Sequence, residues 1–225
     1  MSEQLAGSPG PHVFVESLDD LVVAPQDLDH LAKSLRMRDG DPLTVSDGAG
    51  SWRSAAFSSS GVLSATGEVS FVAEPESEQQ STIAFSLTKN SKPEWVVQKL
   101  TELGVSNIVA LVSERTIVKW DNAKVAKAQS RWERVAREAA MQSHQVRLPS
   151  ISGVLPALEW LARPDVAIAH FGGPAVTPAV RSIAIGPEGG WSSTEVEASA
   201  SMVSLGSTVL RAETAAVAAG VLLTL

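Results

Sequence analysis

The chain has 225 residues, 44% of them hydrophobic, which is enough to bury a core without covalent staples. It contains no cysteine, which excludes disulfides, thiolate nucleophiles and cysteine-based metal sites. The formal net charge of −7 excludes a uniformly basic surface, although residues 1–80 carry −9 and the remainder +2. We find no long apolar run and no charged-then-apolar leader, so we expect no membrane span and a cytoplasmic protein.

The first 73 residues have the pattern of a small β domain. We expect strands at 13–15, 43–45, 52–57 and 67–72, and one helix at about 25–35. Two Asp-Gly pairs, at 39–40 and 47–48, predict tight turns, because Asp tolerates the left-handed conformation and Gly supplies positive φ. A small β-barrel would close such strands. Residues 74–81 are acidic and lack large apolar side chains, which predicts a linker.

Residues 82–225 alternate strand and helix patterns, which predicts an α/β domain with a mostly parallel sheet. The expected strands are 83–87, 108–112, 166–169 and 182–185. Three helices are expected. The first begins with a capping box at Ser91 and Glu94, the second covers about 121–142, and the last covers 212–223. Trp95, Trp132 and Trp160 fall on helical apolar faces, which favours core packing over base stacking.

Two turns near the carboxyl end predict one ligand pocket. An apolar strand at 183–185 leads into Gly186-Pro187-Glu188-Gly189-Gly190, and Ser192 with Glu195 has the spacing of a capping box. A second turn, Leu205-Gly206, leads into Leu210-Arg211-Ala212-Glu213-Thr214. Ligands bind at the carboxyl ends of parallel strands, where such loops gather. The spacing matches neither the dinucleotide fingerprint nor the phosphate loop.

The segments IGPEGGWSSTEVE and VSLGSTVLRAETAAVAAG resemble the carboxyl-terminal signature of the SPOUT superfamily of RNA methyltransferases. Residues 89–104 and Ser113-Glu114-Arg115 resemble the bacterial ribosomal small-subunit uridine-N3 methyltransferases within it. The resemblance implies a PUA-like β-barrel at 1–73, a linker at 74–81 and a SPOUT-type trefoil-knotted domain at 82–225. It also implies a homodimer that uses S-adenosyl-L-methionine to methylate uridine N3 of 16S ribosomal RNA in the small ribosomal subunit.

The resemblance also assigns residues to a cofactor pocket and to catalysis. The expected cofactor-binding residues are His170, Ile185, Gly186, Pro187, Glu188, Gly189, Gly190, Leu205, Gly206, Val209, Leu210, Arg211 and Thr214. For catalysis, Arg211 would stabilise a uracil oxyanion, and Glu213 would orient it or accept a proton. The alternative is a structural Arg–Glu pair that stiffens the loop.

A basic strip suggests where RNA would bind. Lys124, Lys127, Arg131 and Arg134 recur at helical spacing on one face, which either tracks RNA phosphates or forms a solvated face. The expected RNA-binding residues are Arg36, Arg38, Lys89, Lys92, Lys124, Lys127, Arg131, Arg134 and Arg147. No histidine pair has the spacing of metal ligands, so no metal is expected.

One segment departs from the family pattern. Residues 141–145, Met-Gln-Ser-His-Gln, replace an acid, a glycine and an arginine that are common there. Two alternatives therefore stay open. The first is a SPOUT methyltransferase acting on tRNA, at a ribose 2′-oxygen or guanine N1. The second is a non-catalytic RNA-binding or ribosome-assembly factor.

Overall fold

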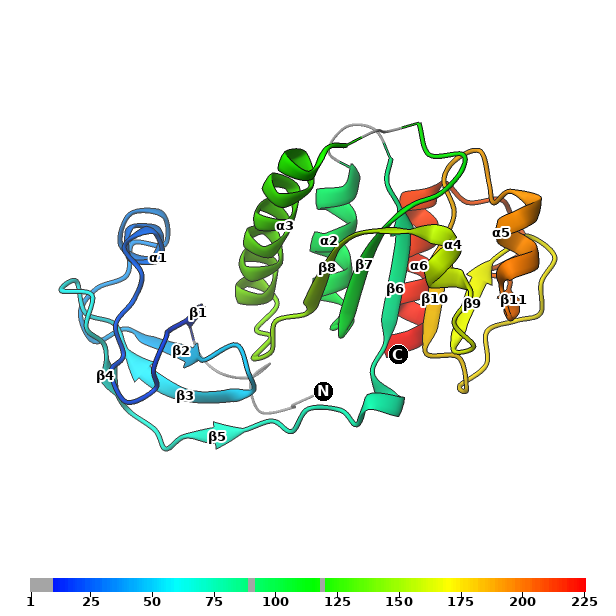
Figure 1. The fold of residues 1–225 in the computed structure, drawn as a ribbon. Helices are drawn as coiled ribbons and strands as arrows, with labels where there is room; N and C mark the ends of the chain where they lie inside the picture. The colour runs from blue at the N-terminus through cyan, green and yellow to red at the C-terminus, as the bar shows by residue number, and fades with distance from the viewer. Residues whose placement is uncertain (1–9, 89–91, 118–119) are drawn as a thin grey trace. The chain divides into compact units, whose positions relative to one another are not determined.

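The computed structural model describes residues 10–88, 92–117 and 120–225. The chain divides into two compact units (Figure 1). The first comprises the residues up to Glu74 together with Glu138–Leu148; the second comprises Pro75–Arg137 and Pro149–Leu225. Lys89 and the Ser91 half of the expected capping box lie outside the described residues.

The first unit is a small sheet with one short helical segment. Its strands are β1 (His12–Phe14), β2 (Pro42–Ser46), β3 (Ser51–Ala56), β4 (Ser64–Ala65) and β5 (Ser70–Phe71). The sheet order is β1-β2-β3-β4, and β5 also pairs with β3. The expected helix is present as α1 (Pro25–Asp29) followed by the π-helical turn η1 (His30–Ser34). The two-residue β4 was not predicted, because Ser-Ala carries no strand signal.

Apolar residues of β1, β2 and β3, together with Leu31 and residues between the strands such as Leu21 and Leu63, form the core of this unit. His12 is buried beside that core, with Nδ1 2.8 Å from Thr44 Oγ1 and Nε2 2.9 Å from Ser46 Oγ. Its ring stacks on His144, with centroids 6.0 Å apart. Met141 packs partly buried against the same core. The segment that departs from the family pattern therefore contributes packing to the first unit.

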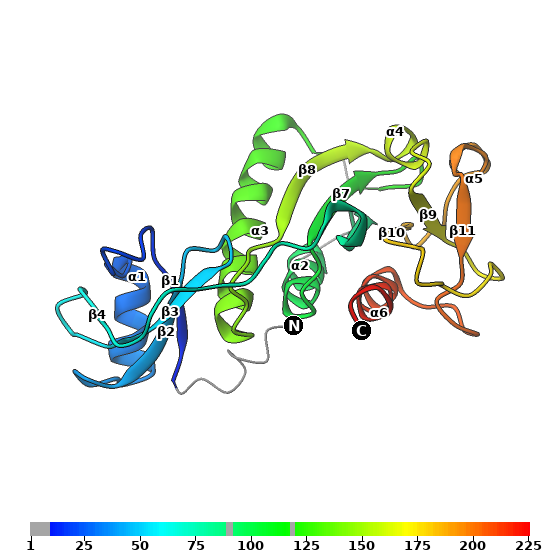
Figure 2. The same cartoon turned by 90° about the horizontal axis from the view of Figure 1, so that it is seen from below.

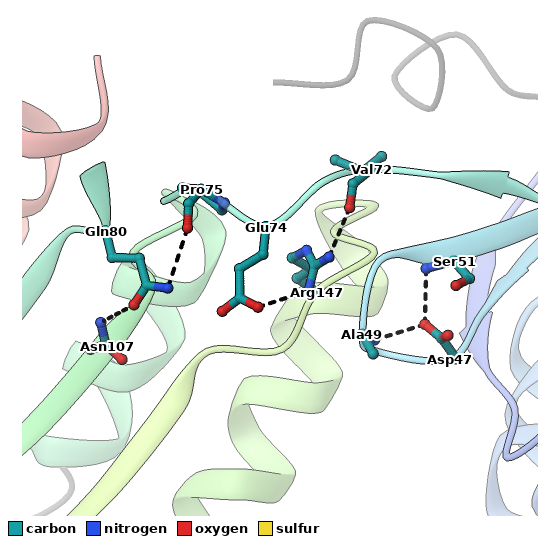
Figure 3. Close-up of polar contacts among 9 residues, drawn as sticks. All are labelled: Asp47, Ala49, Ser51, Val72, Glu74, Pro75, Gln80, Asn107 and Arg147. Atoms are coloured by element: carbon teal, nitrogen blue, oxygen red, sulfur yellow. Dashed lines mark hydrogen bonds and ion pairs between the residues drawn. The ribbon is translucent and has the colours of Figure 1, made fainter. Parts of the chain in front are cut away.

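Arg147 fixes the returning segment to the end of the β region (Figure 3). Its Nη2 donates to the carbonyl oxygen of Val72 at 2.8 Å, and its Nη1 lies 3.7 Å from a Glu74 carboxylate oxygen. The guanidinium also lies over the Phe71 ring, 5.5 Å from its centroid. This residue is also one of those expected to bind RNA, and the structure shows its contacts within its own unit.

The second unit is built on a six-stranded sheet in which every neighbouring pair is parallel. Its order is β11-β9-β10-β6-β7-β8. The strands are β6 (Thr82–Ser86), β7 (Asn107–Val112), β8 (Ser150–Pro156), β9 (Val166–Ala169), β10 (Ser182–Ile185) and β11 (Ser201–Val203). The expected parallel α/β sheet is confirmed. The edge strands β8 and β11 were missed, since one contains Gly and Pro and the other has three residues.

Helices cover both faces of this sheet (Figure 2). α2 (Lys92–Glu102), α3 (Asn122–Gln142) and α6 (Ala212–Thr224) share one core with Ile83 and Phe85. α4 (Ala157–Leu161) and α5 (Ser193–Ala198) pack on the other face, against Ala84. Successive strand residues point to opposite faces, so β6 supplies both cores.

The expected linker contains a 3-10 turn, η2 (Ser77–Gln79), and Gln80 donates to the Pro75 carbonyl oxygen (Figure 3).

The last helix approaches α2 closely. A methyl group at Gly220 would lie 2.8 Å from Leu100 Cδ2 and 3.0 Å from Leu103 Cδ1. The small residues of α6 thus permit this packing distance.

The expectation for the three tryptophans is corrected in part. Trp132 is buried, but Trp160 is half-buried, and Trp95 is 42% exposed. The reason is that Trp95 lies beside the apolar stripe of α2, whereas Val96, Val97 and Leu100 face the core.

Within the three described ranges, no helix is long and apolar enough to cross a membrane.

Candidate active site

A cavity of about 590 Å³ lies at the carboxyl ends of the neighbouring strands β9, β10 and β11. Ala169 ends β9 and His170 follows it, Ile185 ends β10 and Gly186 follows it, and Ser204 follows β11. This is the edge of an open parallel sheet at which ligands bind. The volume is within the range of small-molecule sites.

The two predicted loops form walls of this one cavity. Eleven of the thirteen expected cofactor-binding residues line it: His170, Ile185, Gly186, Pro187, Glu188, Gly190, Leu205, Gly206, Val209, Leu210 and Arg211. Gly189 and Thr214 are not among its lining residues. The carbonyl oxygen of Gly189 accepts a hydrogen bond from Arg115 Nη1 at 2.9 Å. Thr214 is an exposed residue in the first turn of α6.

Sequence reasoning missed several lining residues. These are Arg115, Ala169, Phe171, Trp191, Ser204, Thr208, Ala212 and Ala215. Arg115 comes from the loop after β7, so a third loop reaches the cavity. In the sequence, Arg115 stood out only as part of the Ser113-Glu114-Arg115 motif, to which no function was assigned. Trp191 is 7% exposed, and its Nε1 is buried with no hydrogen-bond partner among the described residues. An orphan donor of this kind suits a ligand acceptor.

The first loop is held by a capping box at the start of α5. Ser192 Oγ accepts from the Glu195 backbone N–H at 3.2 Å, and Glu195 Oε2 accepts from the Ser192 N–H at 2.9 Å. The predicted capping box is therefore confirmed. Glu195 is only 1% exposed, and its Oε1 also accepts from the Glu114 N–H at 2.9 Å. One buried carboxylate thus joins the loop after β10 to the loop after β7.

Lys92 joins the first loop to the last helix. Its Nζ lies 3.2 Å from Glu188 Oε1 and 3.2 Å from Glu213 Oε1. The hydrogen bonds to Glu188 and Glu213 raise the pKa of Lys92 above its ordinary value of 10.5. Burial would raise the pKa of Glu213, but its own backbone N–H and Lys92 outweigh burial and lower it. Glu213 is thereby held as a carboxylate.

The two expected catalytic residues have different surroundings. Arg211 lines the cavity, is exposed, and forms the N-cap of α6, where its carbonyl oxygen accepts from the Ala215 N–H at 2.8 Å. Glu213 does not line the cavity, and its side chain pairs with Lys92. Arg211 is therefore the cavity-lining member of the pair.

The basic strip lies on the exposed side of α3. Lys124, Lys127, Arg131 and Arg134 are all exposed, and Arg131 Nε lies 3.2 Å from Glu94 Oε1. In the first unit, Arg36 and Arg38 are exposed, and Arg36 has a left-handed φ of 56°.

The parts of the chain that the structure describes hold no group of three or more His, Asp or Glu side chains able to bind a metal ion.

The comparisons with known proteins agree with this geometry. The family model of the RNA methyltransferase domain matches residues 75–224, so the fold and the cavity belong to this class of protein. The ribosomal RNA small subunit methyltransferase E of Mycobacterium bovis is 32% identical over 92% of this chain and 88% of its own length. The protein of the same name from Synechocystis is 31% identical over 91% and 72%. The chain belongs to the ribosomal RNA small subunit methyltransferase E family.

Solved structures share the fold over nearly the whole chain. A putative methyltransferase from Legionella pneumophila, in complex with the bound cofactor SAM, has a TM-score of 0.80 at 27% identity, covering 94% of this chain and 96% of the other. A probable rRNA-methyltransferase from Porphyromonas gingivalis has a TM-score of 0.74 at 28% identity, covering 94% and 95%.

Proposed function

We propose that the protein transfers a methyl group from S-adenosyl-L-methionine to uridine N3 of 16S ribosomal RNA. The observation that carries this proposal is the single cavity at the carboxyl ends of β9, β10 and β11, walled by the two glycine-containing loops. Membership of the small subunit methyltransferase E family supports ribosomal RNA as the substrate. The Legionella relative, which binds SAM, supports the cofactor.

The residues present fit this cofactor. Apolar side chains such as Leu205 and Leu210 and the backbone of Gly186 and Gly190 line the cavity. Backbone N–H and C=O groups can bind the edge of a neutral adenine without adding charge. Among the described residues, Trp191 Nε1 is a buried donor with no hydrogen-bond partner, and a Cβ at residue 186 would lie 3.1 Å from its indole, a tight contact. These residues would hold the adenosine part of the molecule.

Bound S-adenosyl-L-methionine would supply the methyl group and a good leaving group. In the proposed reaction the uracil N3 proton would pass to solvent water, and negative charge would grow on the flanking oxygens until N3 takes the methyl group. The bond from the methyl carbon to sulfur would break, and S-adenosyl-L-homocysteine would leave. Arg211 is exposed at the cavity wall and would stabilise that charge. Glu213 has a lowered pKa and is paired with Lys92, so we assign it an orienting role rather than the role of a base.

The proposal includes the arrangement of the whole enzyme. The first unit would be the PUA-like barrel that binds RNA, and the second unit would carry the trefoil knot. Exposed Trp95 on α2 and Leu222 on α6 support a homodimer, since these two helices contact each other and leave apolar side chains uncovered.

The test is nucleoside mass spectrometry of 16S ribosomal RNA from a strain that lacks the gene. We expect 3-methyluridine to disappear and to return when the gene is restored. Purified small subunits and tRNA are then offered as methyl acceptors in parallel. Methylation of tRNA alone would favour the tRNA enzyme. If the deletion strain keeps 3-methyluridine and the purified protein methylates neither acceptor, a non-catalytic factor is favoured.

A further inference from the structure

Lys92 stands where local helix electrostatics disfavour it. It is the first residue of α2, and a helix N-terminus carries a partial positive charge that repels a cation. A residue that breaks a local rule needs a compensating interaction. Here two carboxylates supply it, from Glu188 and from Glu213.

The three charged groups come from distant parts of the chain. Glu188 is 96 residues from Lys92 and lines the cavity, and Glu213 is 121 residues away in the first turn of α6. Lys92 and Glu213 are largely covered, with side chains 31% and 18% exposed, whereas Glu188 is 53% exposed. Without the ammonium between them, the two carboxylates would repel each other. The loop after β10 would then lose its charged link to α2 and α6.

We infer that Lys92 is a positioning residue that holds the Glu188 loop against the start of α6 and so keeps the cofactor cavity in shape. This inference rests on the proposed function, because it assumes that the cavity binds S-adenosyl-L-methionine. It also replaces the expectation that Lys92 binds RNA phosphates. In its described position the ammonium is already used by two carboxylates.

The experiment is calorimetric titration of four proteins: the wild type, Lys92→Met, Lys92→Arg and the control Lys99→Met. Lys99 lies on the same helix and pairs with Glu102, at 2.8 Å, but does not line the cavity. Each protein is titrated with S-adenosyl-L-methionine and with its demethylated product S-adenosyl-L-homocysteine. The second ligand lacks the sulfonium charge, so its affinity does not include the interaction of that cation with the local charge that the substitution changes.

We expect Lys92→Met to weaken binding of S-adenosyl-L-homocysteine about fivefold, because a partly exposed ion pair contributes about that much to an equilibrium constant. Lys92→Arg should restore most of the affinity, because arginine also bridges two carboxylates. Lys99→Met should bind as the wild type does. Circular dichroism and urea unfolding establish that each variant is folded before it is titrated.

A double-mutant cycle ties the effect to the loop. In a Glu188→Gln background, Lys92→Met should cost much less than it does in the wild type, since the link is already broken. Equal costs in both backgrounds would overturn the inference.

The outcomes also separate this inference from the proposed function. A wild-type protein that binds neither ligand would remove the proposed function itself. A folded Lys92→Met variant that binds the product with wild-type affinity would overturn the positioning role alone. An RNA affinity whose salt dependence falls in Lys92→Met, with cofactor affinity unchanged, would return Lys92 to the RNA-binding residues.

Discussion

The carboxylate of Glu195 accepts a hydrogen bond from the backbone N–H of Glu114 at 2.9 Å, across 81 residues of chain. The same side chain caps α5 through the Ser192 N–H. The loops after β7 and β10 therefore depend on one buried acceptor, and both contribute residues to the cavity.

Replacing Glu195 by alanine should lower the free energy of unfolding by about 2 kcal/mol. The reason is that the N–H groups of Glu114 and Ser192 would each lose their acceptor. Urea unfolding measures the change. Glu197→Ala is the matched control, because Glu197 is exposed on the same helix, and we expect it to stay within about 0.5 kcal/mol of the wild type. Equal effects of the two substitutions would contradict the bridging role of Glu195.

Gly186→Ala should weaken cofactor binding more than tenfold, whereas Gly189→Ala should change it little. A methyl group at Gly186 would lie 3.1 Å from Trp191 Cε2, inside the cavity wall. At Gly189 the nearest neighbour would be Arg115 Cβ at 3.6 Å, an ordinary contact. Binding is measured by calorimetry. Similar losses in both variants would show that the Trp191 contact does not set the cavity shape.

The fold was predictable where the sequence carries a period or a capping signal. The buried strands of the second unit and its long helices follow apolar patterns, and α5 follows the spacing of Ser192 and Glu195. The return of residues 138–148 to the first unit was not predictable, because it depends on long-range contacts such as Arg147 with Val72. Nothing in the local pattern records which distant carbonyl an arginine will reach.

The candidate site was predictable for its backbone and less so for its side chains. Glycine-containing loops after buried strands can be recognised in a sequence, and eleven of the residues expected from them line the cavity. The ion-pair partner of Glu213 could not be predicted without the three-dimensional structure. Glu213 pairs with Lys92 from another helix, whereas the sequence shows only that Arg211 is two positions away. For the same reason Arg115 was missed, since its loop follows a different strand.

Arg211→Ala should lower kcat about 100-fold while leaving the cofactor dissociation constant within about threefold, the pattern of a group that acts on charge developing in the reaction. Arg211 is suited to this role because its side chain is exposed at the cavity wall. Arg163→Ala is the control, since Arg163 pairs with Asp165 and does not line the cavity. Single-turnover methyl transfer to small ribosomal subunits measures the rate. An unchanged rate would leave Arg211 with a structural role.

The link between Lys92 and Glu213 should make stability depend on pH at both ends of the range. The pKa of Glu213 is lowered in the folded state, so its contribution is present above its ordinary value of 4.5 and is lost as pH falls through the folded pKa. The pKa of Lys92 is raised, so its contribution is present below 10.5 and is lost as pH rises through the folded pKa. Urea unfolding of the wild type and Glu213→Gln should therefore differ most between these values and converge in acid. A difference that persists unchanged at about pH 3 would contradict the linkage.

If the strip on α3 binds RNA phosphates, its members should contribute unequally. Lys127 and Arg134 are exposed, and we expect Lys127→Ala and Arg134→Ala each to reduce the slope of log affinity against log salt by about one. Arg131 already contacts Glu94 at 3.2 Å, so Arg131→Ala should reduce the slope by less. Filter binding of a 16S ribosomal RNA fragment at several salt concentrations measures the slopes, and Lys99→Ala is the control because Lys99 pairs with Glu102. Slopes that stay at the wild-type value in both Lys127→Ala and Arg134→Ala would identify the strip as a solvated helix face, since counterion release requires that these cations meet phosphates.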